Sequence, residues 1–147
     1  MRKEIRQQIR EAYKAWTPRS DPYQYFDWLQ VFTPIEKNVW SDIRFLGLPF
    51  YPQFPVERYF VDFADPVKKI AIEVDGKEWH GDYEKDKLRQ IEIEKLGWTI
   101  VRILGQDTFK HEEGDEESDD CGVSESEKIL QELKNNEYTP PDEPESL

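Results

Sequence analysis

Three acidic side chains lie near the ends of two short segments that have the alternation of β-strands. Asp62 lies in the first segment, and Glu73 and Asp75 lie in the second. Burying an unpaired charge costs free energy, so acids in apolar strands usually hold a cation or take part in proton transfer. These residues indicate a divalent-metal site, and hydrolysis of a phosphodiester is the first chemistry to consider.

The alternation of a strand also predicts how these acids are arranged. Residues two apart share a face, so Glu73 and Asp75 project from the same side of their strand. Mg²⁺ prefers hard oxygen ligands, keeps several of its waters and lowers the pKa of a bound water. Without a cation, Asp62, Glu73 and Asp75 would repel one another and one of them would tend to protonate. We therefore expect Mg²⁺, with Mn²⁺ as a substitute, to stabilise the protein.

Local signals predict the elements that position these acids. A helix over residues 33–46 begins with a capping box between Thr33 and Glu36 and stops at Gly47. Strands are predicted at 50–55, 58–64, 69–75 and 98–104, with a helix at 82–96 before the last of them. The order helix, three strands, helix, strand predicts an α/β fold with a mixed sheet. The residues expected to turn inward are Ile35, Val39, Ile43 and Leu46 in the first helix and, partly, Leu88, Ile91 and Leu96 in the second.

An additional amphipathic helix is predicted at the N-terminus, over residues 2–16. Its apolar face carries Ile5, Ile9, Ala12 and Trp16. Basic residues recur at every fourth position on another face, which is typical of a solvated helix surface and is also suited to a phosphate backbone. The members of this basic stripe are Arg2, Arg6, Arg10 and Lys14.

Composition limits the class of protein. The chain has 147 residues, enough for one domain with a core, and no apolar run approaches the roughly 20 residues of a membrane span. The charged N-terminus does not resemble a signal peptide. The single cysteine, Cys121, favours a reducing, cytoplasmic setting, and one Cys with two His excludes a Cys-rich zinc site.

The net charge of −12 is concentrated at the C-terminal end. Residues 112–147 hold 14 acids and two bases, so residues 1–111 are neutral overall and a polyanionic substrate is not excluded. The acidic run 112–122 is predicted to be disordered, and a capping box at Ser124 predicts a short helix after it. Three regions follow: an N-terminal helix and connector (1–32), a core with the acids (33–111) and an acidic tail (112–147).

The run from Pro34 to Phe109 resembles the very-short-patch-repair-like (Vsr-like) endonucleases of the PD-(D/E)XK nuclease superfamily. The resemblance covers about half of the chain and rests on order and spacing rather than on any one piece. The matching features are Glu36, Gln53, Val61-Asp62-Phe63, Ile72-Glu73-Val74-Asp75-Gly76, Trp79-His80, Asp86 with Arg89, Gly97-Trp98 and Val101-Arg102-Ile103.

This resemblance implies a restriction-endonuclease-like core and a Mg²⁺-dependent endodeoxyribonuclease. Asp62 and Glu73 look like the family's metal-binding acids, and the carbonyl of Val74 would supply another ligand. Glu36 resembles a helix glutamate that completes the site through water. His80 resembles a histidine that Vsr-like enzymes place beside the scissile phosphate, and Gln53, Asp86 and Arg89 would support the site.

One departure from the family pattern concerns Asp75, which stands where the E-x-K element has its lysine. Lys77, Lys87 or Arg89 could replace that lysine, and His80 could act as base or acid. The zinc ligands of the repair enzymes are missing, so a mismatch-repair role is not carried over.

Other interpretations of the same residues stay open. Asp62 could pair with Arg58 or Arg102, Asp75-Gly76 could form a hairpin turn, and Glu36 could serve only its capping box. His80 could simply pack beside Trp79, and Asp86 and Arg89 could form a surface ion pair.

The competing functions are a metal-dependent DNA endonuclease and a non-catalytic module that binds nucleic acid or a partner. The acidic tail could also imitate phosphate and suppress activity, although a solvated tail is the simpler interpretation. No helix-turn-helix or zinc finger is recognisable to read bases, so a homodimer or a targeting protein partner is considered.

Overall fold

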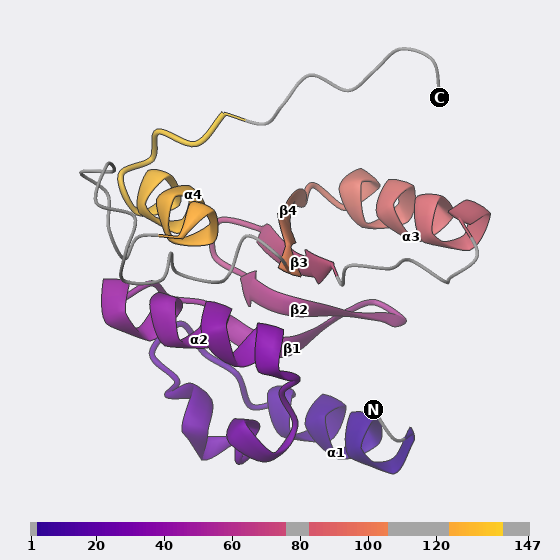
Figure 1. Cartoon of the computed structure of the whole chain (residues 1–147). Helices are drawn as coiled ribbons and strands as arrows, with labels where there is room; N and C mark the ends of the chain where they lie inside the picture. The colour runs from indigo at the N-terminus through magenta and orange to yellow at the C-terminus, as the bar shows by residue number, and fades with distance from the viewer. Residues whose placement is uncertain (1–2, 76–82, 106–123, 140–147) are drawn as a thin grey trace, which may run out of the picture.

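The computed structural model describes residues 3–75, 83–105 and 124–139 of the chain. At its centre lies a four-stranded sheet with the strand order β1-β2-β3-β4 (Figure 1). The first three strands are antiparallel neighbours, and β4 runs parallel to β3, so the predicted mixed sheet is confirmed. The strands are β1 (Tyr51–Val56), β2 (Tyr59–Asp65), β3 (Ile70–Asp75) and β4 (Thr99–Leu104).

The helices α2 (Pro34–Leu46) and α3 (Tyr83–Lys95) complete the predicted order, because α2 precedes the sheet and α3 crosses from β3 to β4. A crossover of this length is what two parallel neighbouring strands require. The strand bounds differ from the predicted ones by no more than one residue. No helix in the described parts of the chain is long and apolar enough to cross a membrane.

Helix α2 begins and ends as its sequence predicts. The Thr33 side chain accepts a hydrogen bond from the Glu36 N–H at 3.3 Å, and Glu36 Oε1 accepts one from the Thr33 N–H at 2.9 Å. Gly47 ends the helix in the left-handed region with φ 68°, a conformation that glycine adopts without steric cost. Val39, Ile43 and Leu46 are buried as expected.

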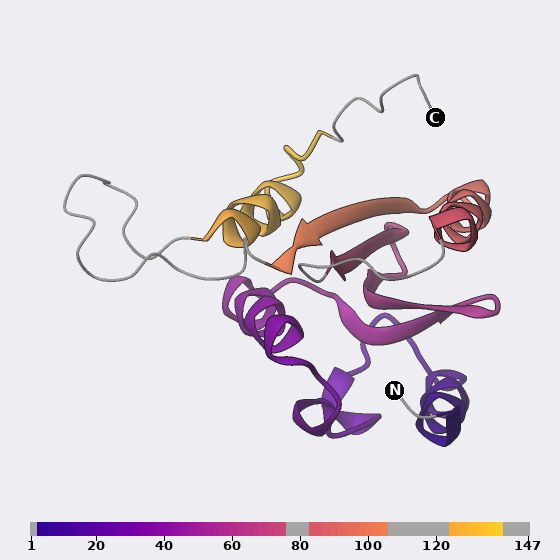
Figure 2. The same cartoon turned by 45° about the vertical axis from the view of Figure 1, so that its right-hand side comes forward.

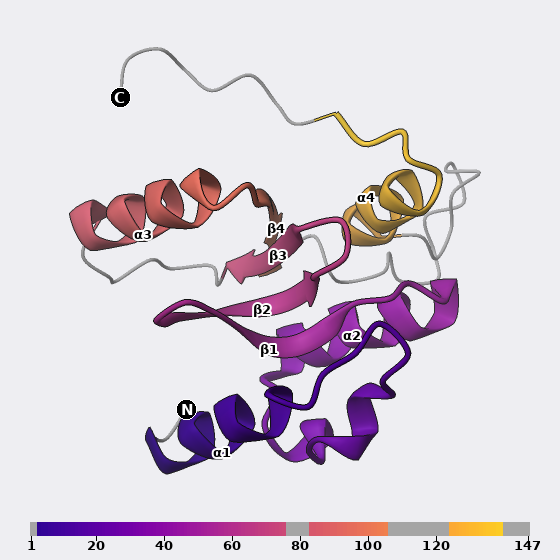
Figure 3. The same ribbon diagram turned by 180° about the vertical axis from the view of Figure 1, so that it is seen from behind.

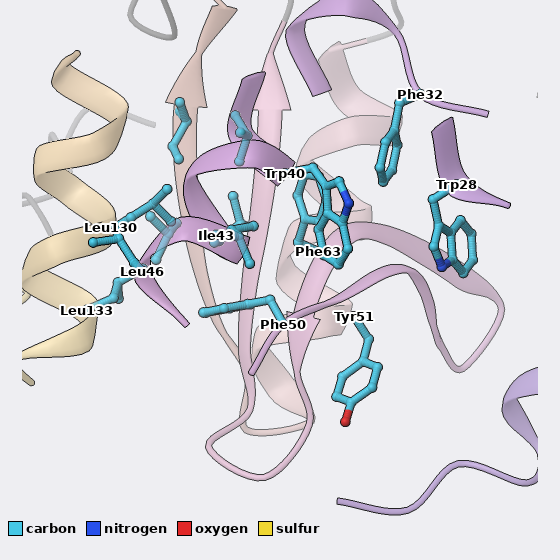
Figure 4. Packing of buried hydrophobic residues seen from close by; sticks show 14 of the residues in the cluster. Trp28, Phe32, Trp40, Ile43, Leu46, Phe50, Tyr51, Phe63, Leu130 and Leu133 are labelled. Atoms are coloured by element: carbon cyan, nitrogen blue, oxygen red, sulfur yellow. The ribbon is translucent and has the colours of Figure 1, made fainter. Parts of the chain in front are cut away.

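Aromatic side chains fill the core between α2 and the sheet (Figure 4). Trp40 of α2 stacks on Phe63 of β2, with ring centroids 6.0 Å apart and an interplanar angle of 3°. Phe32 packs against both of these rings, and Trp28, in the 3₁₀ turn Trp28–Gln30, is fully buried beside it. This cluster fixes the distance between α2 and β2, the two elements that carry Glu36 and Asp62.

The helix predicted after Ser124 is α4 (Glu125–Lys134), and the Ser124 hydroxyl accepts a hydrogen bond from the Glu127 N–H. Leu130 and Leu133 are buried in the same core cluster as Leu46 and Phe50 (Figure 4). Helices α4 and α2 lie side by side in Figures 1 and 2. Residues 124–139 of the acidic region therefore belong to the packed body of the molecule.

Helix α1 (Lys3–Tyr13) lies along β1 (Figure 3). Of its predicted apolar face, Ile9 is fully buried, and Ile5 and Trp16 are partly buried against the core. Tyr13 is buried as well, and its hydroxyl donates to the Pro52 carbonyl at 2.6 Å. The helix ends at Tyr13 rather than at Trp16, and the Trp16 ring packs against Tyr51 and Phe54 of β1.

The inward face of α3 differs from the prediction. Leu88, Ile91 and Leu96 are 52%, 38% and 40% exposed, whereas Ile93 is fully buried against the sheet. Instead of an apolar stripe, α3 directs Asp86, Arg89 and Gln90 toward β3 and β4, where they form hydrogen bonds and ion pairs. Polar partners on the sheet thus decide which face of α3 turns inward.

Candidate metal and phosphodiester site

Asp62 and Glu73 meet where the pairing of β2 and β3 ends. The ladder pairs Phe63 with Ile72 and continues away from Asp62, so the two strands separate at this point. At this point the main-chain N–H of Val74 donates a hydrogen bond to Asp62 Oδ2 at 2.7 Å. The two carboxyl groups also share a hydrogen bond, so the structure brings together two of the three acids found in the sequence.

Burial decides the protonation of this pair. It raises the pKa of Asp62 well above its usual range, and the charges of Glu73 and Glu36 raise it further, while the Val74 N–H opposes the shift. Burial also raises the pKa of Glu73, but the Arg89 guanidinium counteracts part of this effect. The shared hydrogen bond raises the pKa of Asp62 and lowers that of Glu73. In the absence of a cation, desolvation therefore favours a protonated form of this pair.

Glu36 serves both the helix and the site. One of its carboxylate oxygens completes the capping box, and Oε2 accepts a hydrogen bond from the Gln53 side chain at 3.0 Å. Glu36, Gln53 and Asp62 line one cavity of about 350 Å³. The remaining residues around this cavity come from α1, from the segment before α2 and from the cap of α2: Ile5, Arg6, Gln30, Val31 and Thr33.

Gln53 has an unusual backbone conformation beside the acids. The β1–β2 register pairs Pro52 with Phe63 and Phe54 with Val61, which places Gln53 opposite Asp62. Gln53 adopts φ 48°, and the ladder is interrupted at this position. A non-glycine residue in the left-handed region costs about 1 kcal/mol or more, and such residues cluster at functional sites.

Asp75 and Asp86 do not join Asp62 and Glu73, because both of them contact Arg102. The Arg102 Nη1 atom lies 3.2 Å from both carboxylate oxygens of Asp75, and Nη2 lies 3.3 Å from Asp86 Oδ2. Gln90 Oε1 accepts from the same guanidinium at 2.6 Å. The sequence suggested Arg102 only as a possible partner of Asp62, and Gln90 was not identified from the sequence. The parallel register, which pairs Arg102 with Glu73, is the signal that could have found the arginine.

The alternative pairings considered from sequence differ from the observed ones. Arg58 pairs with Glu92, and Arg102 pairs with Asp75 and Asp86, so Asp62 has neither arginine as its partner. Arg89 pairs with Glu73 across the site rather than with Asp86 on its own helix. The polar face of α3 is thus used within the fold and is not a solvated surface.

The predicted basic stripe of α1 is divided among different contacts. Arg10 donates to the Glu57 carbonyl at 2.7 Å and lies 4.7 Å from the centre of the Phe60 ring. Lys14 pairs with Glu11 at 2.9 Å, whereas Arg6 lines the cavity beside Asp62. Arg2, Lys77 and His80 lie outside the described residues.

The chemistry of the acid pair fits a divalent cation. Within the described parts of the chain, no three His, Cys, Asp or Glu side chains gather closely enough to form a metal centre by themselves. The available donors are two carboxylates and the main chain of Val74, whose N–H faces Asp62 and whose carbonyl points toward the same side of the strand. Burial raises the pKa of both acids, and Arg89 balances only Glu73, so a hard cation would supply the positive charge that Asp62 lacks.

Comparison with known proteins identifies related sequences. The model of the family REase_MTES_1575 matches residues 35–118, more than half of the chain. An uncharacterised protein of Haemophilus influenzae is 36% identical over 83 residues, which is 53% of this chain and 69% of that protein. The uncharacterised protein YcjD of Escherichia coli is 29% identical over 108 residues, which is 71% of this chain and 84% of YcjD.

A longer relative and one solved structure extend the comparison. An uncharacterised protein of Mycobacterium tuberculosis is 39% identical over 70 residues, but these are only 26% of its length. The catalytic domain of the homing endonuclease I-Bth0305I matches with a TM-score of 0.54 and 21% identity, over 74% of this chain and the whole of that domain. The latter likeness shows a shared fold.

Proposed function

Because the chain belongs to the REase_MTES_1575 family of restriction-endonuclease-like proteins, we propose that it is a metal-dependent endonuclease that hydrolyses DNA phosphodiester bonds. The observation that carries this proposal is the pair of acids Asp62, which is half-buried, and Glu73, which is buried. They meet where the pairing of β2 and β3 ends, and desolvation raises the pKa of both. Such strongly perturbed acids beside a cavity are typical of functional sites.

Asp62, Glu73 and the Val74 carbonyl are the proposed ligands of Mg²⁺, with Mn²⁺ as a substitute. When bound, such an ion lowers the pKa of a coordinated water and offsets charge on the phosphoryl oxygens. Glu36 would orient water at the cavity side of the site, and Gln53 holds the Glu36 carboxylate in position through its 3.0 Å hydrogen bond. The interruption of the β1–β2 ladder at Gln53, opposite Asp62, supports a role in the site, because such unusual backbone conformations cluster at functional sites.

The positive charge of the family's lysine would be supplied from elsewhere. Asp75 holds Arg102, and Arg89 contacts Glu73 directly, so two arginines bring positive charge to the edge of the site. We place Asp75 and Asp86 in supporting roles through Arg102. The proton-transfer group remains assigned to Lys77 or His80 as a proposal from the sequence.

Helix α1 is the proposed contact for the DNA backbone. Arg6 is the member of the basic stripe that lines the cavity, and the other predicted members, Arg2, Arg10 and Lys14, would add positive charge to this contact. A chain with this one core and no recognisable base-reading motif would cut both strands as a homodimer or with a targeting protein.

The experiment that tests the proposal is cleavage of supercoiled plasmid and of labelled single- and double-stranded oligonucleotides with Mg²⁺ or Mn²⁺. Asp62→Ala and Glu73→Ala should abolish cleavage, while Glu94→Ala, an exposed change on α3, should retain it. Cleavage that survives both site changes would contradict the proposal.

A second candidate function is a non-catalytic module that binds nucleic acid or a partner protein. The observation that favours it is Asp75, which replaces the lysine and is already engaged by Arg102. In that case, no metal or substrate would support cleavage, and Asp62→Ala would leave DNA affinity unchanged in a gel-shift titration.

A further inference from the structure

Arg89 connects α3 to both strands of the site. Its Nη2 atom donates to a Glu73 carboxylate oxygen and to the main-chain carbonyl of Phe60, the latter at 2.6 Å. The guanidinium also lies 5.7 Å from the centre of the Tyr59 ring. The Arg89 and Glu73 side chains are only 20% and 9% exposed, so water screens their attraction weakly.

This contact places a positive charge on one of the two proposed metal ligands. A carboxylate oxygen that accepts a hydrogen bond from a guanidinium has less electron density to offer a cation, and two positive charges on one carboxylate repel each other. Arg89 and a divalent cation are therefore expected to compete for Glu73.

We propose that Arg89 is the resident counter-ion of Glu73 in the metal-free protein, and that a divalent cation displaces its guanidinium toward a phosphate of bound DNA. This proposal rests on the proposed endonuclease function and explains how the site tolerates buried acids before it is loaded. It assigns to Arg89 a role that links occupancy of the metal site to affinity for the substrate.

The surroundings of Arg89 identify phosphate as the anion that would receive it. Asp75 and Asp86 already contact Arg102, and Glu92 pairs with Arg58. Arg102 also satisfies Gln90, the next residue on α3. Within the described part of the site, Asp62 has no arginine partner, but it is a proposed ligand of the same cation and would not be free to receive Arg89. A displaced guanidinium can instead bind a phosphate in a bidentate manner.

The first test is calorimetric titration of Mn²⁺ and of Ca²⁺ into the DNA-free protein. Arg89→Gln should bind the metal about tenfold more tightly than wild type, because one competing charge is removed. Lys95→Gln removes a charge from the same helix away from the acids and should bind like wild type. Equal or weaker binding by Arg89→Gln would overturn the proposal, since it would mean that Arg89 orients Glu73 as a ligand.

A second readout covers the case in which Arg89→Gln is poorly folded without metal. The rise in melting temperature on adding Mn²⁺ should be larger in Arg89→Gln than in wild type, and Arg89→Lys, which keeps a smaller competing charge, should lie between them. A smaller rise in Arg89→Gln than in wild type would contradict the competition.

The link to DNA is tested by the affinity for a short duplex, measured with EDTA and with Ca²⁺ at one fixed salt concentration. Ca²⁺ should increase the affinity of wild type more than that of Arg89→Gln, and an equal increase would overturn the transfer of Arg89 to phosphate. If wild type neither binds Mn²⁺ nor cleaves DNA, the proposed function itself fails. If wild type binds Mn²⁺ and cleaves DNA, but Arg89→Gln binds metal and DNA as wild type does, the counter-ion role alone is wrong.

Discussion

At the scale of single residues, Asp62 has the most unfavourable environment in the described site. Its carboxyl group is desolvated and close to Glu73 and Glu36, and the Val74 N–H offsets only part of the cost. A residue kept under such conditions lowers the stability of the metal-free fold. Its retention is understandable if the same environment creates affinity for a cation. Water solvates these carboxylates poorly, so a bound cation would stabilise their charge more than it would at an exposed site.

The raised pKa of Asp62 predicts how stability depends on pH. A folded-state pKa above the unfolded one means that the folded state binds more protons, so stability falls as pH rises from about 4 through the raised pKa. Asp62→Asn removes this penalty and should increase metal-free stability at neutral pH by roughly 1–3 kcal/mol. Urea unfolding with EDTA between pH 4 and pH 8 measures both effects.

The same series in Mn²⁺ provides the control. Wild type should gain stability from the metal, and Asp62→Asn should gain far less. A metal-free stability that is independent of pH in wild type, or unchanged by Asp62→Asn, would contradict the assigned environment.

Glu36 allows the capping and site roles to be separated. Glu36→Gln keeps one acceptor oxygen for the Thr33 N–H and turns an NH₂ donor toward Gln53, whose amide can rotate to present its oxygen. The change should therefore alter stability little but reduce cleavage, since the charge beside the cavity is lost. Thr33→Ala should cost about 1 kcal/mol of stability and leave the Glu36 carboxylate charged. Unfolding curves and cleavage rates of the two variants distinguish these roles, and equal losses of activity would contradict a site role for Glu36.

At the scale of elements, the sequence was sufficient wherever the signals were local. The start of α2 depends on Thr33 and Glu36, three residues apart, and its end depends on Gly47, so both were predicted. The strands follow from the alternation of apolar residues. The inward face of α3 could not be predicted, because its partners Glu73 and Arg102 are distant in sequence and the apolar residues of α3 follow no single face.

The candidate site shows the same division. Asp62 and Glu73 could be found from their places in two strands. That they lie beside each other, where the β2–β3 ladder ends, depends on the register of the two strands. The sequence also could not show that Asp75 is engaged by Arg102, or that Gln53 leaves the β-conformation opposite Asp62. These features come from contacts between strands, which no local pattern encodes.

Helix α1 provides a prediction at this scale. Arg6→Ala should weaken DNA binding and reduce the slope of log affinity against log salt by about one, because one phosphate contact is lost. Lys14→Ala removes the same charge from a residue that pairs with Glu11 and should have a smaller effect. Duplex binding measured across a range of salt concentrations decides, and identical losses in both variants would indicate a diffuse charge effect instead of a contact at the cavity.

At the scale of the whole molecule, the acidic region has two parts with different roles. Helix α4 belongs to the core, and Leu130→Ala should cost about 2–5 kcal/mol of folding free energy because it leaves a cavity against α2. A test of the tail as an imitation of phosphate therefore cannot remove residues 112–147 as a block. Such a deletion would expose the core surface that α4 covers.

Neutralising the acids of residues 112–120 while keeping α4 is the appropriate test. If these acids cover a basic DNA surface, the change should tighten duplex binding at low salt and speed cleavage. The same affinity in both proteins at low salt would establish a solvated tail. The melting temperature provides the control, because it should not change when α4 is intact.

The composition of β1 has a consequence for self-association. β1 is an outer strand of the sheet, and it contains Pro52 and Pro55, which have no N–H to donate, and Gln53, which leaves the extended conformation. Such a border offers few main-chain donors to a foreign strand, and α1 packs along it. The same residues that shape the site thus protect this border from strand-to-strand aggregation, and a second copy of the chain would not be expected to pair with β1.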